Sequence, residues 1–89
     1  MKIAFRESFA NDLRRHQKQK KFLSRIREII LEIEAAETIA SVKNLKRLKS
    51  EGSYYRIRAG NYRLGLTIEA ETVIFVRALH RKEIYRYFP

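Results

Sequence analysis

Residues 54–68 read YYRIRAGNYRLGLTI, and this stretch decides the fold. Side chains alternate with a period of two on both sides of Gly60-Asn61, which predicts two half-buried strands joined by a tight hairpin turn. The apolar side chains of the hairpin should face a core. The opposite, exposed face should then carry Arg56, Arg58 and Arg63.

The chain before the hairpin predicts one strand and two helices. Residues 1–5 fit a short opening strand. Ser8 is placed to cap a short helix that carries Phe9 and Leu13 on one face and ends near His16, for which we expect no catalytic role. A polar turn over residues 16–21 leads to a second helix with a strong helical period. Its apolar stripe comprises Phe22, Ile26, Ile29, Ile30 and Ile33, widened by Leu23 and Leu31.

The rest of the chain predicts further sheet structure. Residues 43–52 form a basic connection in which Leu45 and Leu48 should point inward. Residues 69–71 predict a turn, residues 72–79 a more buried third strand after the helices, and residues 80–86 a polar tail. The predicted order is β-α-α-β-β-β in a single domain over residues 1–89. We therefore expect an α+β fold, with a small antiparallel sheet and the two N-terminal helices packed on one face.

Charge narrows the classes of partner. Twenty Lys and Arg against ten Asp and Glu leave a net charge of +10. That field favours nucleic acid, the ribosome or an acidic protein over an acidic small molecule. Residues 43–89 hold eleven basic and four acidic side chains, so the charge concentrates on the sheet half. No stretch is apolar enough to span a bilayer, no secretory signal is evident and cysteine is absent, so we expect a cytoplasmic protein without membrane association.

Two clusters could carry chemistry. Arginines on neighbouring strands repel one another unless an anion lies between them, so Arg56, Arg58 and Arg63 form either a phosphate cradle or a solvated basic face. The tail joins His80, Arg81 and Tyr85, a set suited to proton transfer, charge stabilisation and base stacking. It could equally be a solvated turn covering the edge of the core. The sequence contains no metal-ligand motif or glycine-rich phosphate loop, which favours chemistry without a metal or cofactor.

The segments YRIRAGNYRL (55–64), VIFV (73–76) and HRKEIY (80–85) resemble the C-terminal half of toxins of the RelE/ParE superfamily. The order of the preceding elements is also similar, so the resemblance covers nearly the whole chain. It implies a microbial-ribonuclease-like fold and a toxin of a type II toxin–antitoxin system. The implied activity is a ribosome-dependent, metal-independent endoribonuclease that cleaves mRNA in the ribosomal A site.

The resemblance also implies roles for individual residues. Arg56 and Arg58 match positions that contact the RNA backbone, and Arg63 matches the arginine that stabilises the transition-state phosphate. His80 or Arg81, followed by Tyr85, matches the C-terminal group used for proton transfer and stacking. Because arginine is a poor base, His80 or Tyr85 would accept the proton, with Glu51 a weaker candidate. The basic linker should add ribosome or RNA affinity through Lys46, Arg47 and Lys49.

The implied partners are an acidic cognate antitoxin, the ribosome and mRNA, with operator DNA bound only through the antitoxin complex. Two alternatives stay open on the sequence. One is a ParE-type toxin that inhibits DNA gyrase without RNA chemistry. The other is an inactive relative that only binds antitoxin or DNA.

Overall fold

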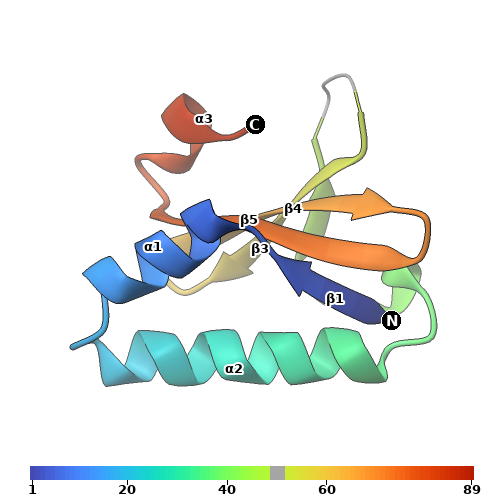
Figure 1. Cartoon of the computed structure of the whole chain (residues 1–89), viewed down its shortest axis with the longest axis horizontal. Helices are drawn as coiled ribbons and strands as arrows, with labels where there is room; N and C mark the ends of the chain where they lie inside the picture. Colours follow the sequence, from blue (N-terminus) through green and yellow to red (C-terminus); the bar gives the residue numbers. More distant parts are fainter. Residues whose placement is uncertain (49–51) are drawn as a thin grey trace.

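The computed structural model describes residues 1–48 and 52–89, and in this part of the chain a five-stranded sheet is combined with three α-helices (Figure 1). The strands lie in the order β1-β5-β4-β3-β2. The elements along the chain are β1 (Lys2–Phe5), α1 (Glu7–Arg15), α2 (Lys20–Ala35), a 3₁₀ turn (Ile39–Ser41), β2 (Leu45–Arg47), β3 (Tyr54–Ala59), β4 (Tyr62–Glu69), β5 (Thr72–His80) and α3 (Ile84–Tyr87).

The predicted hairpin is confirmed. Ala59 pairs with Tyr62, so Gly60-Asn61 is a two-residue turn, and Gly60 has a φ of +62° that suits glycine. β4 continues into β5 through a second tight turn at Ala70-Glu71. The alternation of β3 and β4 sends Ile57, Leu64 and Leu66 toward the main core, where each is at most 1% exposed. The arginines of the hairpin therefore lie on the opposite face.

The main core lies between α2 and one face of the sheet. The predicted stripe supplies Phe22, Ile26, Ile29 and Ile33, all buried, and α2 runs along this face (Figure 1). Leu31 does not widen the stripe as predicted, since it is 57% exposed. Successive residues of an α-helix are about 100° apart around its axis. Leu31 is two residues from both Ile29 and Ile33, so it falls on the solvent side of the helix.

Three details of the sheet and tail correct the prediction. The sheet is mixed, because β1 pairs in parallel with β5. The predicted basic connection contains the edge strand β2, antiparallel to β3. The predicted polar tail contains α3, whose Ile84 is only 1% exposed. These elements depend on tertiary partners: β1 and β5 lie at opposite ends of the chain, and a three-residue strand or four-residue helix carries little periodicity.

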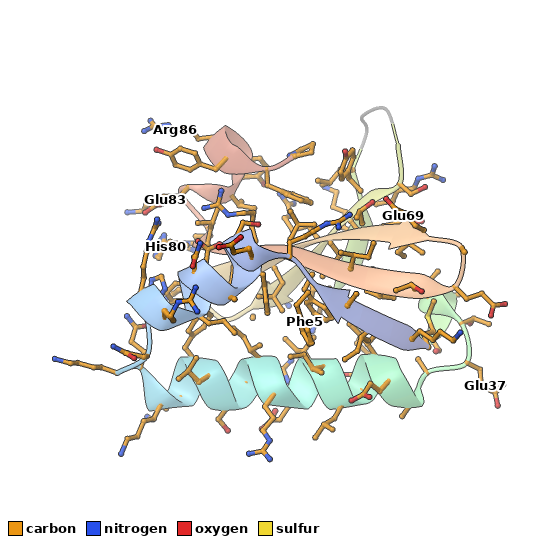
Figure 2. All side chains as sticks on the ribbon, viewed as in Figure 1. Phe5, Glu37, Glu69, His80, Glu83 and Arg86 are labelled. Atoms are coloured by element: carbon orange, nitrogen blue, oxygen red, sulfur yellow. The ribbon has the colours of Figure 1, made fainter. Side chains whose placement is uncertain are left out.

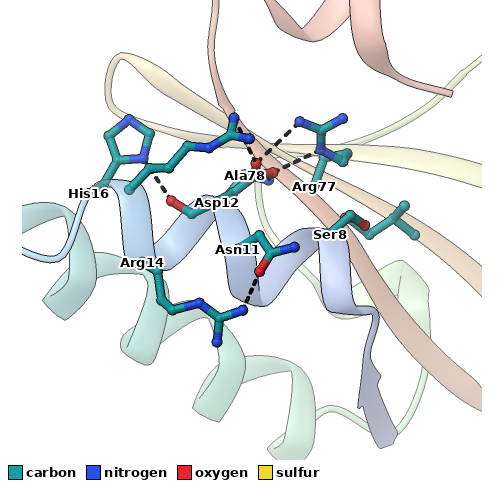
Figure 3. A network of polar contacts seen from close by, with 9 residues as sticks. Ser8, Asn11, Asp12, Arg14, His16, Arg77 and Ala78 are labelled. Atoms are coloured by element: carbon teal, nitrogen blue, oxygen red, sulfur yellow. Dashed lines mark hydrogen bonds and ion pairs between the residues drawn. The ribbon is translucent and has the colours of Figure 1, made fainter.

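Helix α1 protects the edge of β5 beyond the end of β1 (Figure 3). Ser8 is not the predicted N-cap, because the helix begins after Arg6 and the Ser8 hydroxyl instead donates to the Val76 carbonyl at 2.6 Å. Asp12, which is 2% exposed, accepts from the Ala78 N–H at 2.9 Å and from Nε and Nη2 of Arg77 at 2.8 and 3.1 Å. Backbone groups that β1 leaves unpaired are thus satisfied by side chains.

In the described residues, no helix is long and apolar enough to cross a membrane.

Candidate nucleic-acid interface

Cross-strand pairing collects basic side chains on the face of the sheet opposite α2. Arg58 lies directly opposite Arg63, and Lys46 directly opposite Arg56. Like charges in such positions destabilise a sheet. We call this surface the arginine face, defined by Lys46, Arg56, Arg58 and Arg63.

The arginine face is concave. An open depression of about 390 Å³ is lined by these four side chains together with Asn44 and Leu45. Among residues 1–48 and 52–89, ion pairs join Asp12 to Arg15 and Arg77, and Arg25 to Glu28, and none reaches the arginine face. The predicted gathering of the three arginines is therefore confirmed, and in the described chain their charges have no carboxylate partner.

Arg63 is held with part of its guanidinium free. Its Nη1 donates to the carbonyl oxygens of Gly60 and Tyr62, both at 2.8 Å. The Nε–H and Nη2–H edge has no partner in the described part of the chain, and this is the edge that binds a phosphate in bidentate fashion. Burial lowers the pKa of Arg63, and the charges of Arg56, Arg58 and Arg81 lower it further. An anion placed here would relieve that repulsion.

Tyr85 and Arg81 flank the arginine face. The Arg56 guanidinium lies 4.7 Å from the centroid of the Tyr85 ring, a cation–π contact, and the Tyr85 side chain is 75% exposed. Arg56 and Tyr85 also line a second open depression of about 320 Å³, together with Lys46, Arg47 and Leu48. Arg81 is exposed and near enough for its charge to act on Arg63. A cluster of basic side chains and an exposed aromatic ring are thus adjacent.

His80 is not brought to the arginine face. It pairs with Tyr62, its ring lies 5.6 Å from the Tyr62 ring, and both point to the side of α2. The cause is a bulge in β5: Leu66 pairs with Phe75 but Gly65 pairs with Arg77, leaving Val76 as the extra residue. Unbroken alternation would have put His80 beside the arginines.

The hydrogen bonding of His80 and His16 also bears on proton transfer. The Lys82 N–H donates to His80 Nδ1 at 3.2 Å, so in this arrangement Nδ1 is occupied as an acceptor and the neutral ring carries its proton on Nε2. His16 follows α1 and its Nδ1 lies 2.9 Å from the Asp12 carbonyl, which agrees with the predicted place at a helix end. Neither ring is a free base at the arginine face.

The remaining predicted residues are placed as follows. Lys46 lies on β2 directly opposite Arg56, whereas Arg47 pairs with Tyr55 and so occupies the position of β2 that alternates to the other face. Lys49 and Glu51 fall outside the described residues. The acidic side chains Glu37 and Glu69 lie at the opposite end of the molecule from His80 and Arg86 (Figure 2). In the described residues, no group of three or more His, Asp or Glu is placed to hold a metal ion.

Sequence reasoning missed Asn44. This residue lines the depression, has a φ of +60°, and accepts a hydrogen bond from the Arg58 N–H through its carbonyl at 3.4 Å. Asparagine is among the few residues that tolerate the left-handed region, so its position directly before Leu45 was the available signal. It turns the chain into β2 and so places Lys46 opposite Arg56.

The arrangement can bind a polyanion and stabilise charge that develops on a phosphate. Four cations converge on one concave surface, one guanidinium edge is free, and an exposed aromatic ring stands beside them. Electrostatic stabilisation of this kind needs no proton transfer by the arginines, which stay protonated at neutral pH.

Solved structures define the class of protein with this fold. A chain of the RelB-RelE antitoxin-toxin complex from Methanococcus jannaschii is 38% identical, with a TM-score of 0.77 over 97% of this chain and 99% of that chain. YafQ from E. coli strain BL21(DE3) shares the fold at 17% identity, with a TM-score of 0.73 over 93% of this chain and 96% of its own. The fold is that of small toxins of toxin–antitoxin systems.

Sequence comparison identifies the family. The family described as "ParE toxin of type II toxin-antitoxin system, parDE" matches residues 3–85. Toxin RelE3 of Methanocaldococcus jannaschii is 41% identical over 90 residues, covering 100% of both proteins. The chain therefore belongs to the RelE/ParE superfamily of type II toxin–antitoxin toxins, as the sequence motifs predicted.

Proposed function

We propose that this toxin is a ribosome-dependent endoribonuclease that cleaves mRNA without a metal ion. The observation that carries the proposal is the arginine face, where Arg56, Arg58 and Arg63 line one depression without a carboxylate partner in the described chain. A gyrase-binding surface would not need a free guanidinium edge beside an aromatic platform. RNA offers both a phosphate and an unstacked base.

The proposed chemistry is attack of a ribose 2′-oxygen on the adjacent phosphorus. The P–O5′ bond breaks, the 2′-hydroxyl proton leaves to an acceptor, and the 5′-oxygen takes up a proton, giving a 2′,3′-cyclic phosphate and a 5′-hydroxyl end. Arg63 would contact the non-bridging oxygens, with Arg56 and Arg58 on neighbouring phosphates and Arg81 at the rim. Tyr85 would hold a base by stacking.

The position of His80 bears on which group accepts the proton from the 2′-hydroxyl. His80 lies on the far side of the sheet, with Nδ1 already accepting from Lys82. We therefore infer that charge stabilisation and positioning supply most of the rate, and that His80→Ala lowers it less than Tyr85→Ala. This inference changes the role that the sequence suggested for His80.

We further propose that an acidic antitoxin holds the toxin inactive. The net charge of +10 and the arginine face, which has no carboxylate partner among residues 1–48 and 52–89, support an acidic, folding-on-binding segment as partner. Expression of the toxin should stop growth, and co-expression of an adjacent acidic protein should restore it. Normal growth with abundant folded toxin would contradict the proposal.

Single-turnover cleavage of mRNA on a programmed ribosome tests the activity, with ribosome binding measured in parallel. Arg63→Ala should lower the rate by about 100-fold or more while changing affinity little, because its charge counts most in the transition state. Arg63→Lys keeps the positive charge but loses the planar guanidinium that can donate two hydrogen bonds to one phosphate, so it should recover only part of the cleavage rate. Arg27→Ala, which removes an exposed charge from α2, is the matched control.

The outcomes separate the alternatives. If Arg63→Ala cleaves at the parental rate, the arginine face is not the active site. If the parent leaves mRNA intact but inhibits gyrase supercoiling, the toxin is a gyrase inhibitor. If the parent does neither and still binds an acidic partner, it is an inactive relative.

A further inference from the structure

A second, smaller core lies on the same side of the sheet as the arginine face. Leu79, Ile84 and Phe88 are buried there, with Leu48, Tyr54 and Val76 packed around them. Figure 1 shows α3 on this side and α2 on the other. The sheet separates the two cores, so the second core does not share the packing that stabilises α2.

Gly65 is the place on the sheet where this core meets β4. A Cβ at Gly65 would lie only 2.7–2.8 Å from three ring atoms of Phe88. The backbone of Gly65 has no positive φ, so its conformation suits any residue. Glycine is required for space: it lets the Phe88 ring lie directly against the strand.

This contact fixes the end of α3. The helix has only four residues and could not persist without tertiary anchors. Ile84 anchors its first residue, and Phe88, 6% exposed, anchors the chain directly after it. Tyr85 lies between the two anchors, and its ring contacts the Arg56 guanidinium. Its position therefore depends on Ile84 and Phe88, and Phe88 is seated on Gly65, the cross-strand neighbour of Arg56.

We propose that Gly65 and Phe88 are positioning residues: the Phe88 ring, seated on the bare backbone of Gly65, sets Tyr85 over Arg56. The Tyr85 ring, on which a base would stack, is then held in a fixed position beside the depression of the arginine face. The functional part of this inference rests on the proposed ribonuclease activity. The structural part does not.

NMR of the labelled full-length chain tests the structural part. In the parent, the Tyr85 ring current should displace the Arg56 side-chain resonances upfield, and Tyr85→Ala defines their values without the ring. Gly65→Ala and Phe88→Ala should each remove at least half of that displacement. Because Gly65 lies directly opposite Arg56, each variant is compared with the same substitution in a Tyr85→Ala background, which removes any direct effect on the Arg56 resonances. Ile26→Val, which disturbs the main core on the other face, is the control and should leave it unchanged.

The pair provides its own internal check. Adding Gly65→Ala to Phe88→Ala should cause no further loss of the Tyr85-dependent displacement, because the clash exists only with the Phe88 ring present. If Gly65→Ala fails to fold, Phe88→Ala, which adds no atoms, still tests the anchor. A folded Gly65→Ala or Phe88→Ala protein with the parental Arg56 resonances would overturn the proposal.

Cleavage then tests the consequence. Gly65→Ala should lower the single-turnover rate to within about twofold of Tyr85→Ala, and combining the two should lower it no further, as expected for one shared effect. Additive losses would show that Gly65 acts other than through Tyr85 and would overturn the positioning role. If the parent itself does not cleave, the ribonuclease proposal fails, whereas the NMR result still decides whether Phe88 places Tyr85.

Discussion

Replacing Asp12 by alanine should destabilise the protein more than its place on a short helix suggests. Asp12 is buried at 2% exposure and bridges α1 to β5 through Arg77 and the Ala78 N–H. Asp12→Ala would leave the Arg77 guanidinium without its counter-charge and the Ala78 N–H without an acceptor. The same hydrogen bond raises the pKa of Arg77 in the parent. Without it the guanidinium still stays protonated at any ordinary pH, because arginine is a very weak acid, so its charge would remain uncompensated.

The magnitude follows from the burial of the two partners. Removing one member of a buried ion pair costs about 3–5 kcal/mol. The Arg77 side chain is 21% exposed and can turn partly toward water, so we expect the lower end, about 3 kcal/mol. For a domain of this size, about 4–8 °C of Tm accompanies each kcal/mol, which gives a loss of about 12–24 °C. Asp12→Asn keeps an acceptor oxygen and should lose about half as much.

Urea and thermal denaturation measure the loss of stability in Asp12→Ala, and a double substitution tests its cause. Asp12→Ala/Arg77→Met removes both charges and should be more stable than Asp12→Ala alone, because apolar replacement of a whole pair is often nearly neutral. The reasoning is refuted if Asp12→Ala costs less than about 1 kcal/mol, or if the double variant is no more stable than Asp12→Ala.

Three further predictions concern charge and backbone. Arg58→Gln should stabilise the fold by about 0.2–1 kcal/mol at low ionic strength by relieving repulsion from Arg63, and urea titrations at high salt should show no gain. Lys46→Gln should reduce the slope of log affinity against log salt for RNA by about one while leaving saturated cleavage unchanged. Ala70→Gly should raise the unfolding free energy by about 0.5 kcal/mol, because Ala70 has a φ of +55° in the β4–β5 turn, and an equal or lower Tm would contradict this.

Sequence periodicity predicted the elements that bury a full face. The hairpin around Gly60-Asn61 and the apolar stripe of α2 were correct because many residues repeat the same signal there. β2 and α3 were missed for the opposite reason. Each is only a few residues long and so repeats too little of a pattern, and each depends on packing outside itself: β2 on pairing with β3, and α3 on the second core.

The face on which the candidate site residues lie could be predicted for the hairpin but not for β5. Regular alternation was enough to gather Arg56, Arg58 and Arg63 on one face, where the structure has them. Tyr85 also lies there, although its ring is exposed where the sequence allowed it to cover the core edge. His80 could not be placed by alternation, since a single extra residue reverses the face of everything after it.

That bulge at Val76 connects the stability of the fold to the make-up of the site. Phe75 faces the main core, and regular alternation would send Arg77 into the same core. With Val76 as the extra residue, Ala78 enters the core instead, Arg77 is free to pair with Asp12, and Leu79 moves to the second core that anchors α3. The same shift removes His80 from the arginine face and leaves Tyr85 as the predicted proton-transfer residue beside the arginines. A bulge that protects a charged side chain from burial thus also determines which side chains lie on the arginine face.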